Sequence, residues 1–256
     1  MIRFLLLLMA GSCGAAPFGF NRPQVSRGLV AWWTMNDGSG TNGVDSSGFA
    51  RTIGFTNTPA WSNAVVRTGI NFASASTQYG QIASDPLFGA SATNMSVCVW
   101  LRPNSIAAGT YTYLMGNSDD PHANGFQMAI EDRLNVNGFT LRTNSLTVFV
   151  GTAGNTDYGA NVNNAFDITT GFHCWCVVYN GVSVVVYKDG VSQTVNASTT
   201  FNANGDYVPR NAALYLAVTD VKNHSFNGVM DDVRIYSRAI TQAEAAQIYG
   251  GGYGSQ

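Results

Sequence analysis

Short apolar runs separated by polar turn residues dominate the chain from Gly28 onward. These runs are too short for typical helices, and Gly, Asn, Asp or Ser residues bound them, which is typical of β-strands joined by turns. Many such strands in succession favour a β-sandwich or a β-barrel. The clearest candidate strands are residues 29–33, 95–101, 111–115, 146–150, 174–179, 182–187, 214–218 and 233–236.

The segment "VVYNGVSVVVYKDGVSQTV" contains two turn dipeptides, Asn180-Gly181 and Asp189-Gly190. Both dipeptides accept the positive φ angles that tight hairpins require. The segment therefore predicts three antiparallel strands in a meander.

One helical candidate, "AITQAEAAQIY", follows the last strand. Thr241 and Glu244 have the spacing of a capping box, in which each side chain accepts a hydrogen bond from the other residue's backbone N–H. Gly250 then ends the helix. The pattern thus predicts an all-β fold closed by one short C-terminal helix.

Charged residues make up 11% of the chain, and the formal net charge is −2. A typical soluble protein has about 25% charged residues, so Asn, Ser, Thr and Gly cover much of this surface instead. A near-neutral chain lacks the basic surface that nucleic acids and anionic membranes attract. We therefore expect no nucleic-acid partner.

The N-terminal segment "MIRFLLLLMAGSCGA" has one basic residue, a short apolar core and small residues after it. This pattern is typical of a secretory signal peptide, here residues 1–15, and it is too short to span a bilayer. Residues 16–27 then form a linker or arm. The pattern predicts a secreted or cell-surface protein without a transmembrane segment; the alternative is a retained apolar arm that packs against another subunit.

Four segments together resemble the laminin-G-like, concanavalin A-like jelly-roll modules: "GLVAWWTMNDGSGTNGVDSSG", "MSVCVWLRPNS", "YNGVSVVVYKDGV" and "FNGVMDDVRIYSRAITQAEAAQIY". They stand in the order that the family has and span residues 28–249, with a Gly-rich tail at 250–256. The resemblance implies a two-sheet antiparallel jelly-roll β-sandwich. It also implies ligand sites in loops or on the concave face.

Three cysteines remain once Cys13 leaves with the signal peptide. Cys98 lies within a strand, and Cys174 and Cys176 lie two residues apart on one face of another strand. No pair has the spacing of a zinc site, so the alternatives are a cross-strand disulfide, which an oxidising compartment favours, or three buried thiols. The chain is also similar to the pentraxins, and that similarity implies a disulfide between Cys98 and Cys176, with Cys174 as a buried thiol.

Catalytic carboxylates are scarce. Glycoside hydrolases of this fold need two carboxylates on either side of the scissile bond, but the chain has two glutamates, and Glu244 already caps the helix. Glu131 and Asp132 are neighbours on a strand and therefore face opposite sides. The sequence predicts a protein that is not an enzyme.

Asp231 and Asp232 stand directly before the last strand. The same alternation predicts that these two carboxylates also face opposite sides of the sheet. Asp232 is then expected to be a solvated residue at the strand edge.

Calcium binding is the metal chemistry that the chain favours, because Ca²⁺ takes carboxylate, amide and carbonyl oxygens as ligands. The resemblance implies Asp45 and Asp231 as ligands where the first and last strands meet, and Asp37 is a third candidate. The alternative is that Asp37 and Asp45 stabilise turns through bonds to the backbone.

Carbohydrate recognition uses aromatic faces together with polar side chains that bind hydroxyl groups. Three aromatic residues are the candidates nearest to loops, and the loop "NSDDPHANG" adds two carboxylates and a histidine. A solvated turn is the alternative for that loop. The candidate ligand-binding residues are Trp61, Tyr79, Asp119, Asp120, His122 and Tyr158.

These features favour a non-catalytic binding module that recognises carbohydrate or a glycoprotein surface. One alternative is a structural subunit of a surface assembly, appendage or virion, as a homo-oligomer or in a larger assembly that its N-terminal arm holds. A second alternative is a glycoside hydrolase, which requires an aspartate pair that converges from distant strands.

Overall fold

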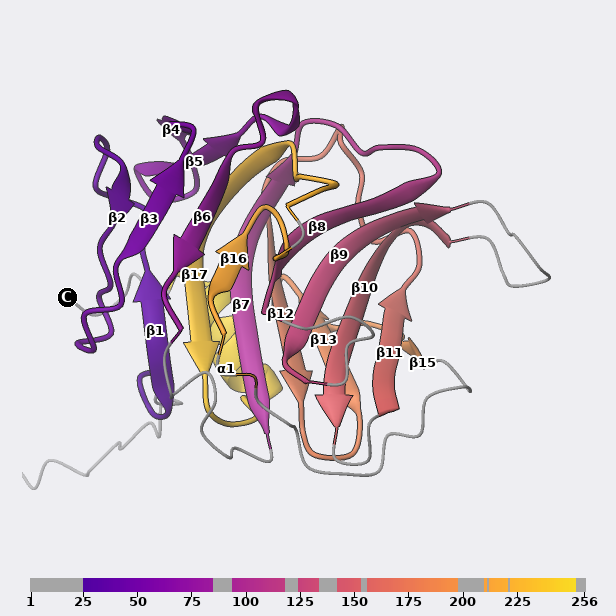
Figure 1. The fold of residues 1–256 in the computed structure, drawn as a ribbon. Helices are drawn as coiled ribbons and strands as arrows, with labels where there is room; N and C mark the ends of the chain where they lie inside the picture. The colour runs from indigo at the N-terminus through magenta and orange to yellow at the C-terminus, as the bar shows by residue number, and fades with distance from the viewer. Residues whose placement is uncertain are drawn as a thin grey trace, which may run out of the picture.

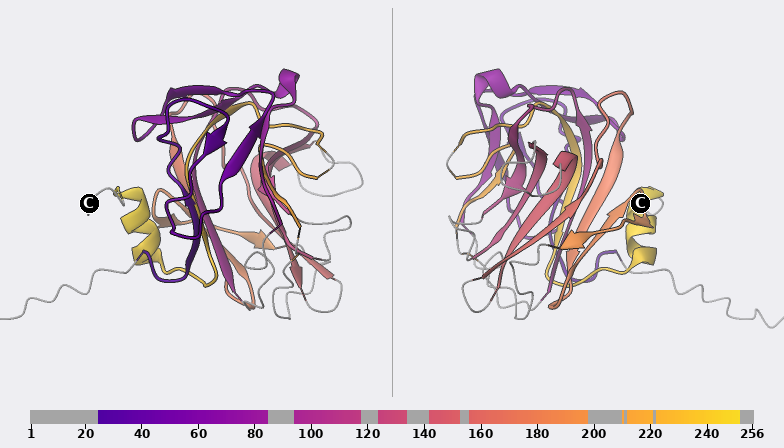
Figure 2. Two further views of the ribbon diagram at one scale, coloured as in Figure 1. Left: turned by 60° about the vertical axis from the view of Figure 1, so that its left-hand side comes forward. Right: turned by 90° about the vertical axis from the view of Figure 1, so that its right-hand side faces the viewer.

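The computed structural model describes residues 25–84, 94–117, 124–133, 142–152, 156–197, 210, 212–220 and 222–251. Within them, two antiparallel β-sheets lie face to face, with one short helix outside the sandwich (Figures 1 and 2). The predicted fold class, an all-β jelly-roll sandwich, is confirmed. The predicted signal peptide and most of the predicted arm lie outside the described residues.

Sheet A has the strand order β14-β13-β12-β7-β17-β5-β4, and β1 pairs with β17 beside β5. Strand β17 lies at its centre and pairs with β7 along one edge and with β5 and β1 along the other. The strands are β1 (Leu29–Trp33), β4 (Ala60–Asn63), β5 (Thr68–Phe72), β7 (Met95–Pro103), β12 (His173–Tyr179), β13 (Val184–Lys188), β14 (Val191–Ser192) and β17 (Gly228–Tyr236).

Sheet B faces the viewer in Figure 1 and has the order β15-β11-β10-β9-β8-β16-β6-β3-β2. Strand β16, which comes late in the chain, inserts between β8 and β6. Sheet B therefore combines strands from both halves of the chain. They are β2 (Asn42–Gly43), β3 (Ile53–Thr56), β6 (Tyr79–Ile82), β8 (Thr110–Gly116), β9 (Phe126–Arg133), β10 (Arg142–Thr152), β11 (Thr156–Val162), β15 (Asn196–Ala197) and β16 (Leu214–Leu216). A short 3₁₀ helix, Ser74–Ser76, precedes β6.

The main hydrophobic core fills the space between the two sheets. Trp33, Phe72 and Trp175 contribute from sheet A, and Met128 and Leu216 contribute from sheet B. Each of these side chains is fully buried, and burying one large apolar side chain stabilises the fold by about 1.5–3 kcal/mol. The inward positions of the strands that form this core are therefore used for packing, and their outward positions are available for other chemistry.

Helix α1 (Gln242–Tyr249) covers the outer face of sheet A (Figure 2). The predicted capping box is confirmed: Thr241 accepts a bond from the Glu244 N–H, and Glu244 accepts one from the Thr241 N–H. The helix buries Ala245 and Ile248 in a second apolar cluster that includes Cys98, and this cluster fixes the helix on the sheet.

The predicted meander is also confirmed, since β12, β13 and β14 pair in sequence through the two turn dipeptides. Gly181 and Gly190 have φ angles of 88° and 76°, in the left-handed region that favours glycine. Gly190 also lies so close to α1 that an added Cβ would stand 2.6 Å from the Cα of Ala246. The turn therefore forms part of the surface on which α1 packs.

Candidate functional site

Strand β17 contains a β-bulge beside its two aspartates. Asp231 pairs with Trp100 and Arg234 pairs with Cys98, so β17 has one residue more than β7 between these pairs. Asp232 has a φ angle of 47°, in the left-handed region. A bulge of this kind interrupts the alternation of side chains along a strand.

The bulge places both carboxylates on the outer face of sheet A. Met230 and Val233, on either side of the pair, belong to the core between the sheets. Asp231 and Asp232 therefore both turn away from that core, and the charge of Asp232 reaches Asp231. The expectation that they face opposite sides is wrong, because it assumed an unbroken pleat.

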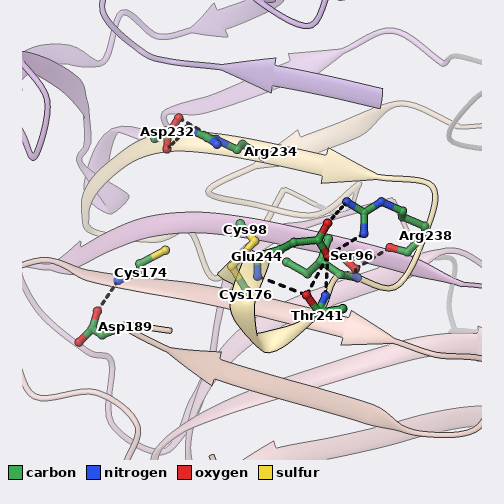
Figure 3. Close-up of a disulfide and its surroundings, with 11 residues drawn as sticks. Ser96, Cys98, Cys174, Cys176, Asp189, Asp232, Arg234, Arg238, Thr241 and Glu244 are labelled. Atoms are coloured by element: carbon green, nitrogen blue, oxygen red, sulfur yellow. Dashed lines mark hydrogen bonds and ion pairs between the residues drawn. A yellow bond between two sulfur atoms is a disulfide. The ribbon is translucent and has the colours of Figure 1, made fainter. Parts of the chain in front are cut away.

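Asp232 is buried, with 3% of its surface exposed. Its carboxylate forms an ion pair with Arg234 (2.9 Å) and accepts a hydrogen bond from the Trp32 indole N–H. The guanidinium of Arg234 in turn lies 4.5 Å from the centre of the Trp32 ring. The expectation of a solvated edge residue is therefore wrong: Asp232 is one half of a buried ion pair (Figure 3).

Asp231 is fully buried and has no guanidinium partner of its own among the described residues. One oxygen accepts the backbone N–H groups of Val65 and Val66, at 3.1 Å each, in the turn between β4 and β5. Burial, with a smaller contribution from the nearby charge of Asp232, raises the pKa of Asp231 to about 7 against the opposing effect of those N–H donors. Asp231 thus ties the closing strand to the β4–β5 turn.

Asp45 also acts on backbone donors. Its two oxygens accept the N–H groups of Trp32, Ser47 and Arg51, together with the Ser47 hydroxyl. Burial would raise the pKa of Asp45, but these hydrogen bonds together lower it. Asp37 accepts one bond, from the Val44 N–H. Both side chains therefore stabilise turns.

The predicted calcium ligands do not gather at one position. In the part of the chain that the structure describes, no three His, Cys, Asp or Glu side chains form a group that could hold a metal ion. Because Asp45 and Asp231 turn oxygens toward N–H donors, those oxygens are placed for hydrogen bonding. Calcium binding by Asp37, Asp45 and Asp231 remains a prediction without support from this geometry.

The structure has a disulfide between Cys98 and Cys176, directly opposite each other on β7 and β12 (Figure 3). This is the pair that the resemblance to pentraxins implies. Cys174 is a free, buried thiol in the same outer cluster under α1. Burial strongly raises the pKa of Cys174, so this thiol is inert while the fold is closed.

Of the predicted ligand-binding residues, the structure describes the side chains of Trp61 and Tyr79, which belong to different sheets. Asp119, Asp120 and His122 lie outside the described residues. Tyr158 lies in β11 opposite Val150, and its side chain is likewise outside the description. Trp61 belongs to β4, donates its indole N–H to the Gly40 carbonyl (2.9 Å), and meets the ring of Phe55 edge-on. Its ring packs against the edge of the core.

Tyr79 lies instead on the outer face of sheet B, where a row of aromatic and polar side chains crosses β9, β8, β16 and β6. These strands are neighbours in the sheet, so the row is about 15 Å long. Each member stands at an outward strand position or in the segment after β16. The members of this outer row are Arg133, Tyr111, Tyr113, His224, Lys222, Tyr215 and Tyr79.

The first half of the outer row is a stack. The rings of Tyr111 and Tyr113 lie nearly parallel, with centres 6.2 Å apart. The guanidinium of Arg133 covers Tyr111 at 3.9 Å, and His224 meets Tyr113 edge-on at 6.0 Å. Nδ1 of His224 also lies 3.1 Å from the Thr110 hydroxyl. The stack therefore presents phenol, guanidinium and imidazole groups side by side.

The second half of the outer row is a pair of tyrosines with a lysine. Tyr79 and Tyr215 meet edge-on, with ring centres 6.1 Å apart. The ammonium group of Lys222 lies 5.4 Å from one ring centre and 6.0 Å from the other. A hydrogen bond with Thr56 is the main cause that lowers the pKa of Tyr79.

Glu131 lies beneath the stack, on the outer side of β9 but only 3% exposed. It accepts a hydrogen bond from Nε of Arg133 (3.0 Å) and another from the Thr147 hydroxyl (2.8 Å). The carboxylate therefore joins β9 to β10 and holds the guanidinium over the Tyr111 ring. Both oxygens have donors, so Glu131 is placed as a support for Arg133.

Sequence reasoning missed the outer row except for Tyr79. Its members come from five separate segments, and only the pairing of β16 between β6 and β8 brings them together. One signal was present: "TYTYL" places two tyrosines at alternate positions of a strand, and hence on one face.

The two antiparallel sheets and the short helix outside them define a jelly-roll module of the concanavalin A-like class. A family model of the concanavalin A-like lectin/glucanases superfamily, Laminin_G_3, matches residues 74–246. The match covers most of the chain, so the protein belongs to this superfamily. No curated protein matches the chain in sequence.

Several solved structures with the same fold are binding domains. The binding domain of Paraclostridial Mosquitocidal Protein 1 is 12% identical, with a TM-score of 0.67 over 91% of this chain and 54% of that one. The binding domain of botulinum neurotoxin DC, solved in complex with SialylT, is 8% identical, with a TM-score of 0.62 over 88% and 52%. The chain spans about half the length of these toxin domains.

A third structure has a length similar to that of this chain. Domain 4 of AbnA, a GH43 extracellular arabinanase from Geobacillus stearothermophilus, was solved in complex with arabinotriose. It is 18% identical, with a TM-score of 0.57 over 86% of this chain and 98% of that domain. At these identities the likeness concerns the fold.

Among the described residues, no helix is long and apolar enough to cross a membrane.

Proposed function

We propose that the protein is a non-catalytic module that binds carbohydrate, free or on a glycoprotein, at the outer face of sheet B. The observation that carries this proposal is the outer row. It offers phenol, guanidinium, imidazole and ammonium groups along the length of a short oligosaccharide, and these groups bind sugar hydroxyls. The likeness to the arabinanase domain solved with arabinotriose supports the same function.

The state of the carboxylates favours binding over hydrolysis. A retaining glycosidase needs two carboxyl groups about 5–5.5 Å apart, one of them free to act as an acid. Glu131 is bonded to Arg133 and Thr147, and Glu244 to Arg238 and Thr241. Both glutamates of the chain thus have structural tasks.

The proposal includes an extracellular location. A disulfide such as Cys98–Cys176 persists in oxidising compartments, and residues 1–15 have the pattern of a signal peptide. Calcium dependence is part of the proposal to be tested. Its test is a thermal melt with and without a chelator, in which an unchanged midpoint contradicts a structural ion.

A glycan array with and without calcium identifies the saccharide, and titration calorimetry with the best oligosaccharide then measures its affinity. Replacing Tyr111 and Tyr113 together by alanine should abolish binding. Tyr249→Ala is the matched control, because Tyr249 is a partly exposed tyrosine that stacks on Trp100 on the opposite side of the sandwich. If no saccharide on the array binds, or if the double variant retains full affinity, the proposal is contradicted and a role in assembly is favoured.

A further inference from the structure

Arg133 presents one side of its guanidinium to solvent. The side chain is 45% exposed, whereas its partner Glu131 is 3% exposed. Glu131 holds the Nε side, and the Tyr111 hydroxyl accepts a bond from one terminal nitrogen. The guanidinium carbon lies 3.9 Å from the centre of the Tyr111 ring, and these two hydrogen bonds leave further terminal N–H donors for a ligand.

A guanidinium edge held in one orientation is suited to bind a carboxylate. Two parallel N–H donors match the two oxygens of a carboxylate, which gives a charge-assisted and directional contact. A single sugar hydroxyl uses only one of these donors. The cost of ordering the Arg133 side chain is already met by Glu131 and Tyr111, so a ligand carboxylate gains the contact without that loss.

Lys222 supplies a positive charge further along the outer row. Its side chain is exposed, and no carboxylate lies within ion-pair distance of it in the described part of the chain. The nearest acidic residue along the chain, Asp220, is paired with Arg210 at 3.2 Å. The exposed charges that the row offers a ligand, Arg133 and Lys222, are therefore both positive.

We propose that the outer row selects an anionic saccharide, with a carboxylate of the sugar on Arg133 and a second acidic group near Lys222. This inference rests on the proposed carbohydrate-binding function and names the ligand class for the same site. Glu131 is the positioning residue, because it orients the guanidinium without meeting the sugar. A protein with a net charge of −2 then binds an acidic polymer through a local basic row.

Calorimetry with two matched probes tests the inference: an oligogalacturonate and the same oligomer with its carboxylates methyl-esterified. The acid should bind at least about tenfold more tightly than the ester, since one hydrogen bond to a charged group is worth that factor or more. The preference should shrink as salt is raised, because partly exposed charges are screened.

Three variants assign the preference to residues. Arg133→Gln should bring the two affinities together, and Lys222→Gln should weaken binding of the acid more than of the ester. Glu131→Gln should lower the preference while binding of the ester stays unchanged, a pattern that a merely structural loss does not produce. Arg27→Gln, an exposed arginine at the start of sheet A, is the control and should retain the wild-type ratio.

The outcomes separate this inference from the function on which it rests. Equal affinity for acid and ester, or an unchanged ratio in Arg133→Gln, overturns the anionic class and leaves carbohydrate binding in place. If the protein binds a neutral sugar such as arabinotriose and does not bind the acidic oligomer, the anionic class is likewise overturned and carbohydrate binding remains. No binding of any saccharide overturns both proposals. Binding of poly-glutamate as tight as that of oligogalacturonate overturns the saccharide part, because it shows that any acidic chain suffices.

Discussion

Asp231 and Asp232, neighbours on strand β17, lie buried on the same face of sheet A, and within the described part of the chain only Asp232 has a guanidinium partner. Two adjacent buried carboxylates with one cation cannot both be charged at little cost. The bulge at Asp232 creates this arrangement, so a local backbone feature sets the electrostatics of the closing strand.

The stability of the protein should therefore depend on the protonation of Asp231. Its folded pKa of about 7 lies above the ordinary value of 3.8, so the folded state holds a proton that the unfolded state releases between these values. The resulting stabilisation is fully present below the ordinary pKa and is lost as pH rises through 7. Its upper bound is about 4 kcal/mol.

Asp231→Asn should remove this pH dependence. Urea unfolding of both proteins between pH 4 and pH 8 measures it, and the difference in their unfolding free energies isolates Asp231 from other titrating groups. The wild type should lose stability relative to the variant as pH rises. Parallel curves contradict the prediction.

Asp232→Asn should behave differently. It leaves the guanidinium of Arg234 buried without its carboxylate, and breaking a buried ion pair from one side costs about 3–5 kcal/mol. The same unfolding experiment at pH 7 checks this value. A cost well below this range would show that Arg234 has another route to charge compensation.

Gly190→Ala should loosen helix α1. The added Cβ would stand 2.6 Å from the Cα of Ala246 at a φ angle of 76°, and overpacking of this kind costs about 1–3 kcal/mol. Gly48→Ala is the control, because its φ angle is 92° and nothing lies within 4 Å of its Cβ. Hydrogen exchange of the α1 amides should quicken in Gly190→Ala only; equal rates in both variants refute the close-contact explanation.

Thiol counting tests the disulfide and the buried thiol together. A chain without Cys13 should show no reactive thiol when folded, one after unfolding without reductant, and three after reduction. Replacing both Cys98 and Cys176 by alanine should lower the unfolding free energy by about 2–5 kcal/mol. Three thiols before reduction would mean that the bond does not form.

The sequence predicts those parts of the fold that depend on neighbouring residues. β-Branched runs such as 182–187, the turn dipeptides, and the Thr241 and Glu244 capping box are local, and each is present in the structure. The short strands β2 to β6 were missed, because polar residues interrupt their apolar positions and their pairing partners are remote.

The sequence does not reveal features that arise between distant strands. The bulge at Asp232 is defined by how β17 pairs with β7, and no residue of "MDDV" signals it. The outer row likewise depends on the insertion of β16 between β6 and β8. Glu131 is buried between two partners, Arg133 on its own strand and Thr147 on the neighbouring strand β10. The second partner depends on how β9 pairs with β10 and cannot be read from the sequence around Glu131.

The central place of β17 in sheet A has a consequence for biosynthesis. Its partners β1, β5 and β7 are made long before it, and its pairing with β1 spans about two hundred residues of chain. A nascent chain that ends before Gly228 therefore holds the two halves of the sheet with no strand to join them, and their open edges invite mispairing. The sandwich can complete its folding only after Gly228–Tyr236 has been synthesised, so truncations that remove β17 should be lost to proteolysis as surely as truncations nearer the start of the chain.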